Sequence, residues 1–197
     1  MPNWAYNRLT LSHKDPAMIE RAVAAFKNGE FLQEFIPCPQ DLLDTMSGYM
    51  GHDTPEQRAL EAKEKSNIQK HGYRNWYDWK LANWGTKWDF GDEGEHTVVY
   101  ESIGSDLLPT VNFSFDTAWS PPIDAYRQLE EQGFIINALY DEESTAFCGE
   151  YVTGKGENTI KMEFNSAWAR ANVPPHIDQA FGIIQRIEEY EEEFEDD

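Results

Sequence analysis

Apolar and polar residues alternate from Tyr6 onward within residues 3–12, and this pattern predicts a β-strand near the start of the chain. Asp15-Pro16 follows directly and is typical of a helix start, with Asp as N-cap and Pro in the first turn. Apolar residues then recur at helical spacing between residues 19 and 26. Asn28-Gly29 ends this pattern. A strand followed at once by an amphipathic helix predicts the first half of a βαβ unit.

The rest of the chain separates into a helical middle and a mixed second half. A Glu-, Lys- and Ala-rich segment predicts a solvent-facing helix over residues 54–70, and a tryptophan-rich block predicts another over residues 75–84. Further along, the patterns predict strands over residues 98–103, 111–115, 134–140, 146–152 and 159–164, and helices over residues 123–132 and from 174 to 187.

One short pattern occurs twice. Phe115 to Tyr126 contains Ala-Trp, a double proline and Ile-Asp, and Phe164 to Phe181 repeats these features with five residues between the Trp and the prolines. In both copies a strand-like stretch precedes the Ala-Trp pair. We interpret the pattern as a repeated strand–turn–helix unit. It predicts architecture and carries no chemistry of its own.

The order of predicted elements is β-α-insertion-β-β-α-β-β-β-α. This order predicts an α+β fold: a mostly antiparallel, ferredoxin-like sheet with helices packed on one face. We predict one domain over residues 1–187, with a helical, Trp-rich insertion at about residues 30–92 and an acidic tail over residues 188–197.

The net charge of the chain limits the kinds of molecule that it is expected to bind. Thirty-six Asp and Glu residues against sixteen Lys and Arg give a net charge of −20 at pH 7. Eight of these acids lie in residues 188–197, so the remaining 28 still exceed the 16 bases by twelve. Nucleic-acid binders gain affinity by placing Lys and Arg on phosphates, so direct nucleic-acid binding is not expected. The acidity favours either plain solubility or a basic protein partner.

The sequence gives no support for a membrane protein, a secreted protein, or a protein that binds a metal or a cofactor. No apolar run is long enough to cross a membrane, and the first residues do not resemble a signal peptide. Cys38 and Cys148 lie in no CxxC pair and predict free buried thiols, which favours the cytoplasm. The five histidines lie far apart, so neither a metal nor a cofactor is expected. They are His13, His52, His71, His96 and His176.

No catalytic motif occurs in the chain, and we predict a non-enzymatic protein. Gly154-Lys155-Gly156 lacks the other residues of a phosphate loop and predicts a hairpin turn. Asp89 and Asp116 lie beside tryptophans, but Asp116 is replaced by Asn165 in the second copy of the repeat. Turn formation therefore explains these carboxylates better than acid–base catalysis does.

The tryptophan-rich block carries the candidate binding site. Four of the seven tryptophans lie within residues 75–89, where Arg74, Lys80 and Lys87 form a basic group in an acidic protein. Indole rings supply large contact area and a hydrogen-bond donor, so the block predicts either a recognition surface or an aromatic core that fixes the insertion. The candidate binding residues are Trp76, Trp79, Trp84, Lys87, Trp88, Asp89 and Trp119.

The chain resembles the YubB-type ferredoxin-like proteins of bacteriophages and conjugative plasmids. Four segments carry the resemblance: Met1-Pro2-Asn3-Trp4 with Asn7-Arg8-Leu9-Thr10, the block from Asn75 to Asp89, Phe115 to Pro122, and Tyr140 to Glu143 with Phe147-Cys148-Gly149. The resemblance implies a ferredoxin-like domain in an accessory protein of a mobile element. No iron–sulfur cluster is implied, since such a cluster needs four Cys ligands and the chain has two.

These observations favour a non-enzymatic accessory protein that binds a host protein in the host cytoplasm. Its sharper form is an anti-defence protein or DNA mimic whose partner is a basic, nucleic-acid-handling protein. The alternatives are a small-ligand binding module built on the Trp-rich block, and an unrecognised enzyme. The edge strands of the sheet could also pair with those of a second copy, so a homo-oligomer is a further alternative.

Overall fold

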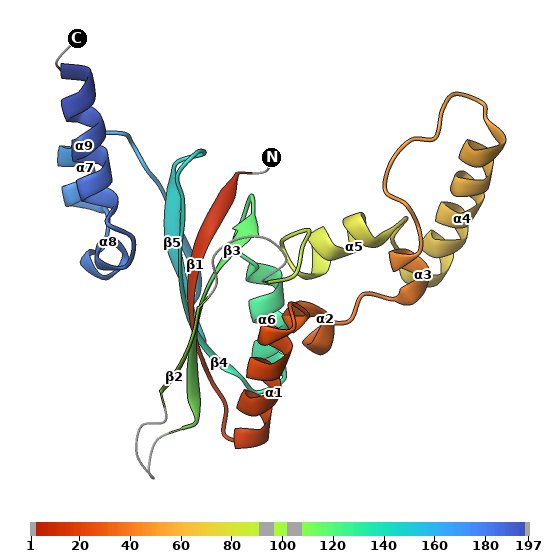
Figure 1. The fold of residues 1–197 in the computed structure, drawn as a ribbon, viewed down its shortest axis with the longest axis horizontal. Coiled ribbons are helices and arrows are strands. Elements are labelled where there is room, and N and C mark those ends of the chain that lie inside the picture. Colours follow the sequence, from red (N-terminus) through yellow and green to blue (C-terminus); the bar gives the residue numbers. More distant parts are fainter. Residues whose placement is uncertain (1–2, 91–96, 102–107, 196–197) are drawn as a thin grey trace.

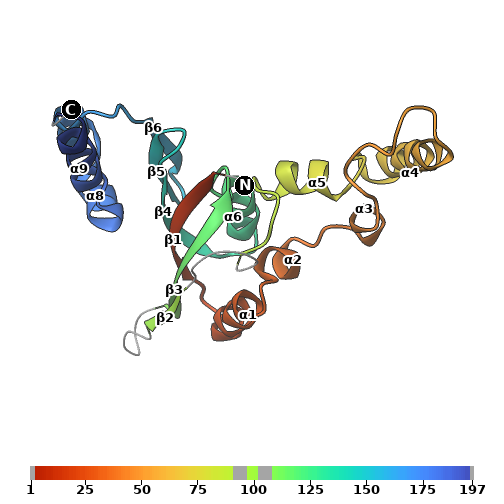
Figure 2. The same ribbon diagram turned by 45° about the horizontal axis from the view of Figure 1, so that its top comes forward.

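The computed structural model describes residues 3–90, 97–101 and 108–195, and their strands form one antiparallel sheet. The described strands follow the order β2–β3–β1–β4–β5–β6 (Figure 2). Their bounds are β1 Trp4–Ser12, β2 Thr97–Glu101, β3 Thr110–Ala118, β4 Ile135–Glu142, β5 Phe147–Val152 and β6 Gly156–Lys161.

The order of the first four strands is ferredoxin-like. Helix α1 (Pro16–Lys27) leads from β1 towards β2, and β3 lies between these two strands. Helix α6 (Ile123–Glu131) leads from β3 to β4, and β1 lies between them. Two such split βαβ units define the ferredoxin-like arrangement. The predicted α+β class is therefore confirmed, and the hairpins of β5 and β6 extend the sheet beyond β4.

The predicted strands differ from the structure in their bounds, and the strand predicted over residues 111–115 is β3, which extends to Ala118. The strand predicted over residues 98–103 is β2, which ends at Glu101, and residues 102 and 103 lie outside the described residues. The strand predicted over residues 159–164 is β6, which begins three residues earlier at Gly156. Gly154 and Gly156 both adopt positive φ, at 78° and 80°, at the predicted hairpin turn between β5 and β6.

The repeated Ala-Trp pattern is not a structural repeat. Trp119 follows β3 directly and has a φ of 69°, in the left-handed region, whereas Trp168 lies inside helix α7 (Ser166–Asn172). Asn165 caps α7 by accepting a hydrogen bond from the Trp168 N–H at 2.8 Å. The same residue pair thus ends a strand in one place and begins a helix in the other.

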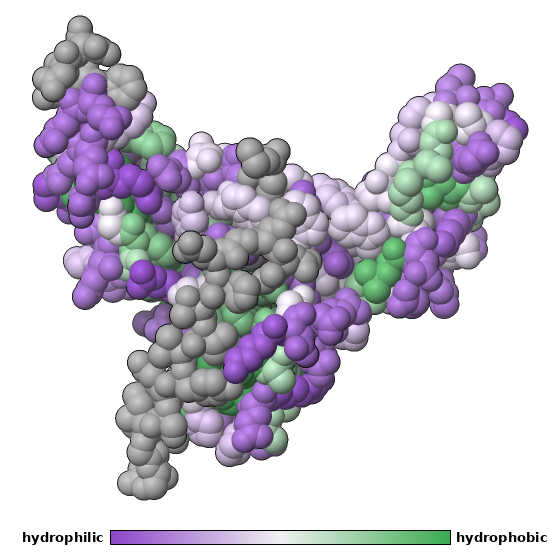
Figure 3. Space-filling view, viewed as in Figure 1, coloured by the Kyte–Doolittle hydropathy of each residue, from purple (hydrophilic) through white to green (hydrophobic). Residues whose placement is uncertain are grey.

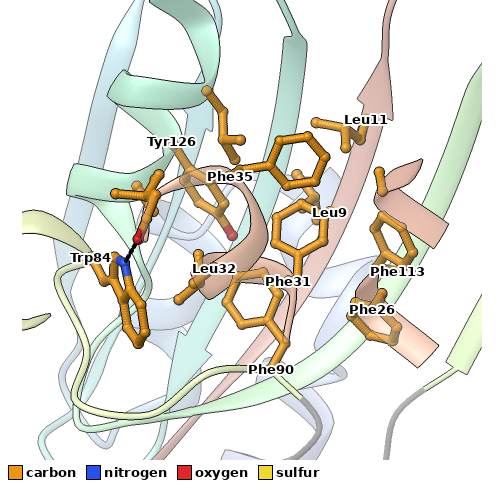
Figure 4. Close-up of a cluster of buried hydrophobic side chains, with 14 of the residues drawn as sticks. Leu9, Leu11, Phe26, Phe31, Leu32, Phe35, Trp84, Phe90, Phe113 and Tyr126 are labelled. Atoms are coloured by element: carbon orange, nitrogen blue, oxygen red, sulfur yellow. Dashed lines mark hydrogen bonds between the residues drawn. The ribbon is translucent and has the colours of Figure 1, made fainter. Parts of the chain in front are cut away.

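An aromatic core fills the sheet face under α1 and α6 (Figure 4). Asp15 caps α1 through the Ala17 N–H, and the predicted apolar stripe of this helix is buried. Phe26 of α1 stacks on Phe113 of β3 with ring centroids 4.3 Å apart. Close aromatic pairs of this kind add to the stability that burial itself supplies.

The insertion begins and ends in this core. Phe31 of helix α2 (Phe31–Phe35) stacks on Phe90 at 5.0 Å, so both ends of the insertion meet at one place. Helix α3 (Gln40–Leu43) leads outward, and helix α5 (Trp76–Asn83) leads back. Between them, helix α4 (Pro55–His71) projects from the body as an arm (Figures 1 and 2).

The C-terminal helices lie on the opposite face of the sheet, which differs from the predicted single helical face. Helix α8 (Pro175–Phe181) contacts β4 and β5, and α9 (Ile183–Glu195) packs on α7 (Figure 1). Their apolar residues form a second core around Cys148. One helix was predicted from residue 174, but Gly182, with a φ of 66°, separates α8 from α9. Residues 188–195 of the predicted acidic tail continue α9.

The two cysteines are free and buried, as predicted. Cys38 lies in the first core and Cys148 in the second. Burial raises the pKa of the Cys38 thiol to about 11 and that of Cys148 to about 12. Both thiols are thus protonated at neutral pH and serve as small apolar side chains.

Gly149 of β5 lies against the ring of Tyr140. Replacing this glycine tests how closely the two residues pack in the sheet. A Cβ atom at residue 149 would lie 2.4 Å from the Asn158 carbonyl oxygen and 2.5 Å from the Tyr140 hydroxyl. The Tyr140 hydroxyl is itself held by Thr159 at 2.7 Å. We expect Gly149→Ala to lower the free energy of unfolding by about 1–3 kcal/mol, measured by urea denaturation.

Gly48→Ala is the matched control for this substitution. Gly48 lies in a loop, and a Cβ there would meet only the flexible end of Met46 at 3.3 Å. Equal stability of the two variants would contradict the packing of Tyr140 over Gly149.

Candidate binding groove on the open sheet face

The predicted tryptophan site divides into a buried set and a surface set. Trp79 and Trp84 belong to the first core, and their rings meet edge to face at 5.9 Å. The indole N–H of Trp84 donates to the Ile36 carbonyl oxygen at 2.9 Å (Figure 4). Trp76 is partly buried and packs against the same core. These three side chains fix the insertion onto the domain, which is the second of the two roles that the sequence left open.

The basic residues of the block are held by their surroundings. The Lys80 ammonium lies 4.4 Å from the ring centroid of Trp84 and 5.4 Å from that of Trp76. Arg74 pairs with Asp78 one turn along α5, at 2.6 Å. Arg74 and Lys80 are thus each in contact with side chains of the insertion itself, although the Arg74 side chain remains 58% exposed.

Asp89 is a structural residue of the insertion. Its carboxylate accepts hydrogen bonds from the backbone N–H groups of Leu32 and Gln33, both at 2.7 Å, and of Phe90 at 2.8 Å. The first two donors belong to the first turn of α2, so Asp89 joins the end of the insertion to its beginning. Burial raises the pKa of Asp89 to about 6, although the three N–H donors oppose this change.

The surface set forms an aromatic cluster of Trp4, Lys87, Trp88 and Trp119. The Lys87 ammonium lies 3.6 Å from the ring centroid of Trp88 and 4.2 Å from that of Trp119. Trp4 meets Trp88 at 5.8 Å. Trp119 is 40% exposed, and its backbone N–H donates to the Asn3 carbonyl oxygen. Of the seven predicted binding residues, Lys87, Trp88 and Trp119 thus come together at the surface.

A polar groove lies on the other face of the sheet, between the central strands and helix α8. The antiparallel register places side chains from β3, β1 and β4 in rows across this face. The three rows are Asp116–Tyr6–Asp141, Ser114–Arg8–Leu139 and Asn112–Thr10–Asn137. Alternate residues of β1, such as Leu9 and Leu11, point into the aromatic core on the opposite face.

One half of the groove has basic and neutral polar walls. It is a hollow of about 450 Å³ whose lining includes no carboxylate among the described residues. The guanidinium of Arg8 lies 5.6 Å from the ring centroid of Phe181 in α8. Within the described residues, every arginine except Arg8 lies within 4.0 Å of a carboxylate. The other polar residues of this half are Thr10, Asn112, Ser114, Asn137, His176 and Gln179.

The other half of the groove contains the carboxylates. It has a volume of about 610 Å³ and is lined by Tyr6, Arg8, Asp116, Asp141 and Arg186, among others. The side chain of Asp141 is 0% exposed. Its Oδ2 accepts a hydrogen bond from Arg186 at 2.9 Å, while its Oδ1 has no donor within the described residues.

Burial shifts the pKa values of the acidic groups in the carboxylate-containing half of the groove. Burial raises the pKa of Asp141, and the neighbouring Arg186 opposes the shift. The pKa of Tyr6 is also raised, first by burial and then by the negative charge of Asp116. A buried carboxylate oxygen without a donor is costly, because hydrogen bonding to water is lost without replacement. This half therefore favours a group that donates hydrogen bonds or carries positive charge.

Sequence reasoning missed this groove. The alternation along residues 3–12 does place Tyr6, Arg8 and Thr10 on one face of a strand. Nothing in the sequence shows that α8 folds back over that face, because α8 returns from the far side of two additional strands. Asp116 was named from the sequence because it lies beside a tryptophan-containing turn. The structure places Asp116 in the groove, together with residues that were not named from the sequence as candidates.

Comparison with known proteins adds little to this geometry. No protein-family model matches the chain, and no curated protein matches it. Among solved structures, the protein api92 from Yersinia pseudotuberculosis, assigned to the family DUF1281, aligns with 83% of this chain and 99% of its own. The sequence identity is 11% and the TM-score is 0.42. A likeness this distant identifies neither a family nor a function for the chain.

The fold and the groove therefore define the class of protein. The chain is an α+β protein with a ferredoxin-like sheet, a helical insertion on one face and a helical lobe on the other. Among the described residues, no helix is long and apolar enough to cross a membrane.

The structural role of Asp89 predicts a pH-dependent stability. The pKa of Asp89 is about 6 in the folded protein and lies above its ordinary value of 3.8, so the folded state binds the proton more tightly. Ionisation of Asp89 thus lowers stability as the pH rises from about 4 to about 6. Asp89→Asn removes this loss. The free energy of unfolding of the variant should therefore rise relative to that of the native protein over this pH range, by at most about 3 kcal/mol.

Urea unfolding of both proteins at several pH values measures this difference. Asp124→Asn, at a surface carboxylate paired with Arg127, is the control and should not show the same trend. A stability difference between Asp89→Asn and the native protein that does not change with pH would contradict the assignment.

Proposed function

We propose that this chain is a non-enzymatic accessory protein of a phage or mobile element that binds a basic host protein in the host cytoplasm. The phage or plasmid setting comes from the resemblance of four sequence segments to the YubB-type proteins. The binding role is supported by the way charge is arranged on the C-terminal helical lobe.

The outward face of α9 is the observation that carries the proposal. Residues 163–197 contain ten carboxylates and two arginines. Arg170 is paired with Glu188, and Arg186 is paired with Asp141 and Glu143. Both bases are thus paired with carboxylates, Arg170 inside the lobe and Arg186 with Asp141 of β4 and the adjacent Glu143, and the other carboxylates determine the charge of the lobe. Figure 3 shows strongly hydrophilic residues over this lobe.

Packing selects which glutamates of α9 face outward. Ile183 and Ile187 are buried in the second core, and Glu191 accepts a hydrogen bond from the Ser166 N–H at 2.9 Å. The remaining glutamates with described side chains, Glu189, Glu192 and Glu193, are exposed. Residues three and four apart on a helix lie about 5–6 Å from one another, so these carboxylates form a compact negative stripe.

A stripe of this kind favours a basic partner. Complementary charge steers the encounter and suppresses binding to acidic surfaces, including nucleic acid itself. A protein groove that normally holds nucleic acid offers the matching surface, which is the basis of the sharper hypothesis of DNA mimicry or anti-defence activity. The aromatic cluster of Trp4, Lys87, Trp88 and Trp119 offers a second contact, one that depends less on charge.

The test is capture of partners from host lysate by the tagged protein at about 50 mM and about 300 mM salt. We expect a basic protein to bind at the lower salt and to be lost at the higher salt. Replacing Glu189, Glu192 and Glu193 by Gln should abolish this capture, because the stripe would lose its charge. The captured protein should then bind purified native chain directly.

The matched control replaces three glutamates of the arm, Glu56, Glu61 and Glu64, by Gln. This changes the net charge by the same amount on α4, and capture should persist. Loss of binding in both variants would show that only total charge matters and would contradict the α9 assignment. Capture that survives high salt and the α9 substitutions, yet is lost on Trp119→Ala, would assign binding to the aromatic cluster instead.

A further inference from the structure

We propose that the groove on the open sheet face binds a small zwitterionic ligand, with an anionic group at Arg8 and an amino group at the Asp116–Tyr6–Asp141 row. This site lies apart from the exposed stripe of α9 and does not depend on the proposed partner protein. The ligand class is an amine joined by a short chain to a carboxylate or a phosphate.

The Arg8 half of the groove is suited to an anion. A guanidinium offers several N–H donors in a planar fork that matches carboxylate and phosphate oxygens. Arg8 is stacked near Phe181, which orients it, and no described carboxylate lies within 4.0 Å of it. Ser114 lies directly across the strand pair from Arg8. The Asn112 Oδ1 accepts from Thr10 at 2.6 Å, which leaves the amide group of Asn112 as a further donor.

The opposite half is suited to an amine. Asp116 and Asp141 lie on either side of Tyr6 in one cross-strand row. The Oδ1 atom of the fully buried Asp141 lacks a donor within the described residues, and an amino group of a ligand would supply one. Arg186 holds only the other oxygen of this carboxylate.

The two halves are close enough for one ligand. Both are lined by Arg8, and their volumes of about 450 and 610 Å³ lie within the range of small-molecule sites. The Arg8 and Tyr6 rows are two residues apart along β1, which corresponds to about 7 Å. An amine and an acid at the ends of a five-carbon chain can span this separation.

Isothermal titration with three compounds of matched length tests the proposal: 6-aminohexanoate, adipate and 1,6-diaminohexane. We expect millimolar or tighter binding of 6-aminohexanoate and much weaker binding of the diacid and the diamine, because each of these satisfies only one half of the groove. Titration with 6-aminohexyl phosphate decides whether the anionic group of the ligand is a carboxylate or a phosphate, according to which zwitterion binds more tightly.

Two surface substitutions connect binding to the groove. Arg8→Met keeps an apolar side chain against Phe181 but removes the charge, and Asp116→Asn removes the opposite charge at similar size. Each should weaken zwitterion binding by about ten- to hundredfold. Arg58→Met, at an exposed ion pair on the arm, is the control and should bind normally. Urea unfolding of each variant verifies that the fold is retained.

Other outcomes overturn the proposal. These are absence of zwitterion binding at millimolar concentration, equal binding of adipate or diaminohexane, and binding that persists in folded Arg8→Met or Asp116→Asn. The variant of α9 with Glu189, Glu192 and Glu193 replaced by Gln should still bind the zwitterion. Failure of the proposed partner binding and failure of the proposed ligand binding can therefore be distinguished.

Discussion

The alternation of side chains along β1 is the constraint on which the rest of this structure depends. This strand lies in the middle of the ferredoxin-like part of the sheet, with β3 on one side and β4 on the other. Leu9 and Leu11 point into the aromatic core, while Tyr6, Arg8 and Thr10 point into the groove. A shift of one residue in register would bury the arginine and expose the leucines, so the polar groove and the core are specified together.

The insertion is attached to this core by polar contacts as well as by packing. Trp84 donates to the Ile36 carbonyl oxygen, and Asp89 accepts from the first N–H groups of α2. Both contacts satisfy backbone groups that burial would otherwise leave without partners. The ends of the insertion are therefore rigid parts of the domain, and α4 carries most of its surface into solvent. The arm exposes Ile68, and the loop that leads to it from α3 exposes Met46, Tyr49 and Met50.

The C-terminal lobe gives the molecule its second face. Its apolar residues cover β4 and β5 around Cys148, and α8 brings Phe181 over Arg8 of the central strand. The same packing turns Ile183 and Ile187 inward and leaves three glutamates of α9 outside. Helices α8 and α9 thus form one wall of the groove and also carry the acidic stripe, and the two surfaces are suited to different ligands.

Local sequence signals determined most of the elements. Asp15-Pro16 indicated the start of α1, the period of two indicated β1 and β3, and the order of elements predicted the ferredoxin-like class. These signals suffice because capping, amphipathic spacing and strand alternation act over a few residues. The sequence alone also gave the acidity of the chain and the pairing of Trp-rich and basic residues in one block.

Only the tertiary structure decided what these residues do. The tryptophans share one composition, yet Trp84 is fully buried while Trp119 is exposed, because burial depends on which helix covers the ring. Ala-Trp ended a strand at Trp119 and entered a helix at Trp168, since the following backbone differs. The groove joins Arg8 to Phe181 and Asp141 to Arg186, which are far apart in the sequence. No local pattern records such a contact, because it arises only when the helices after β6 fold back across the open face.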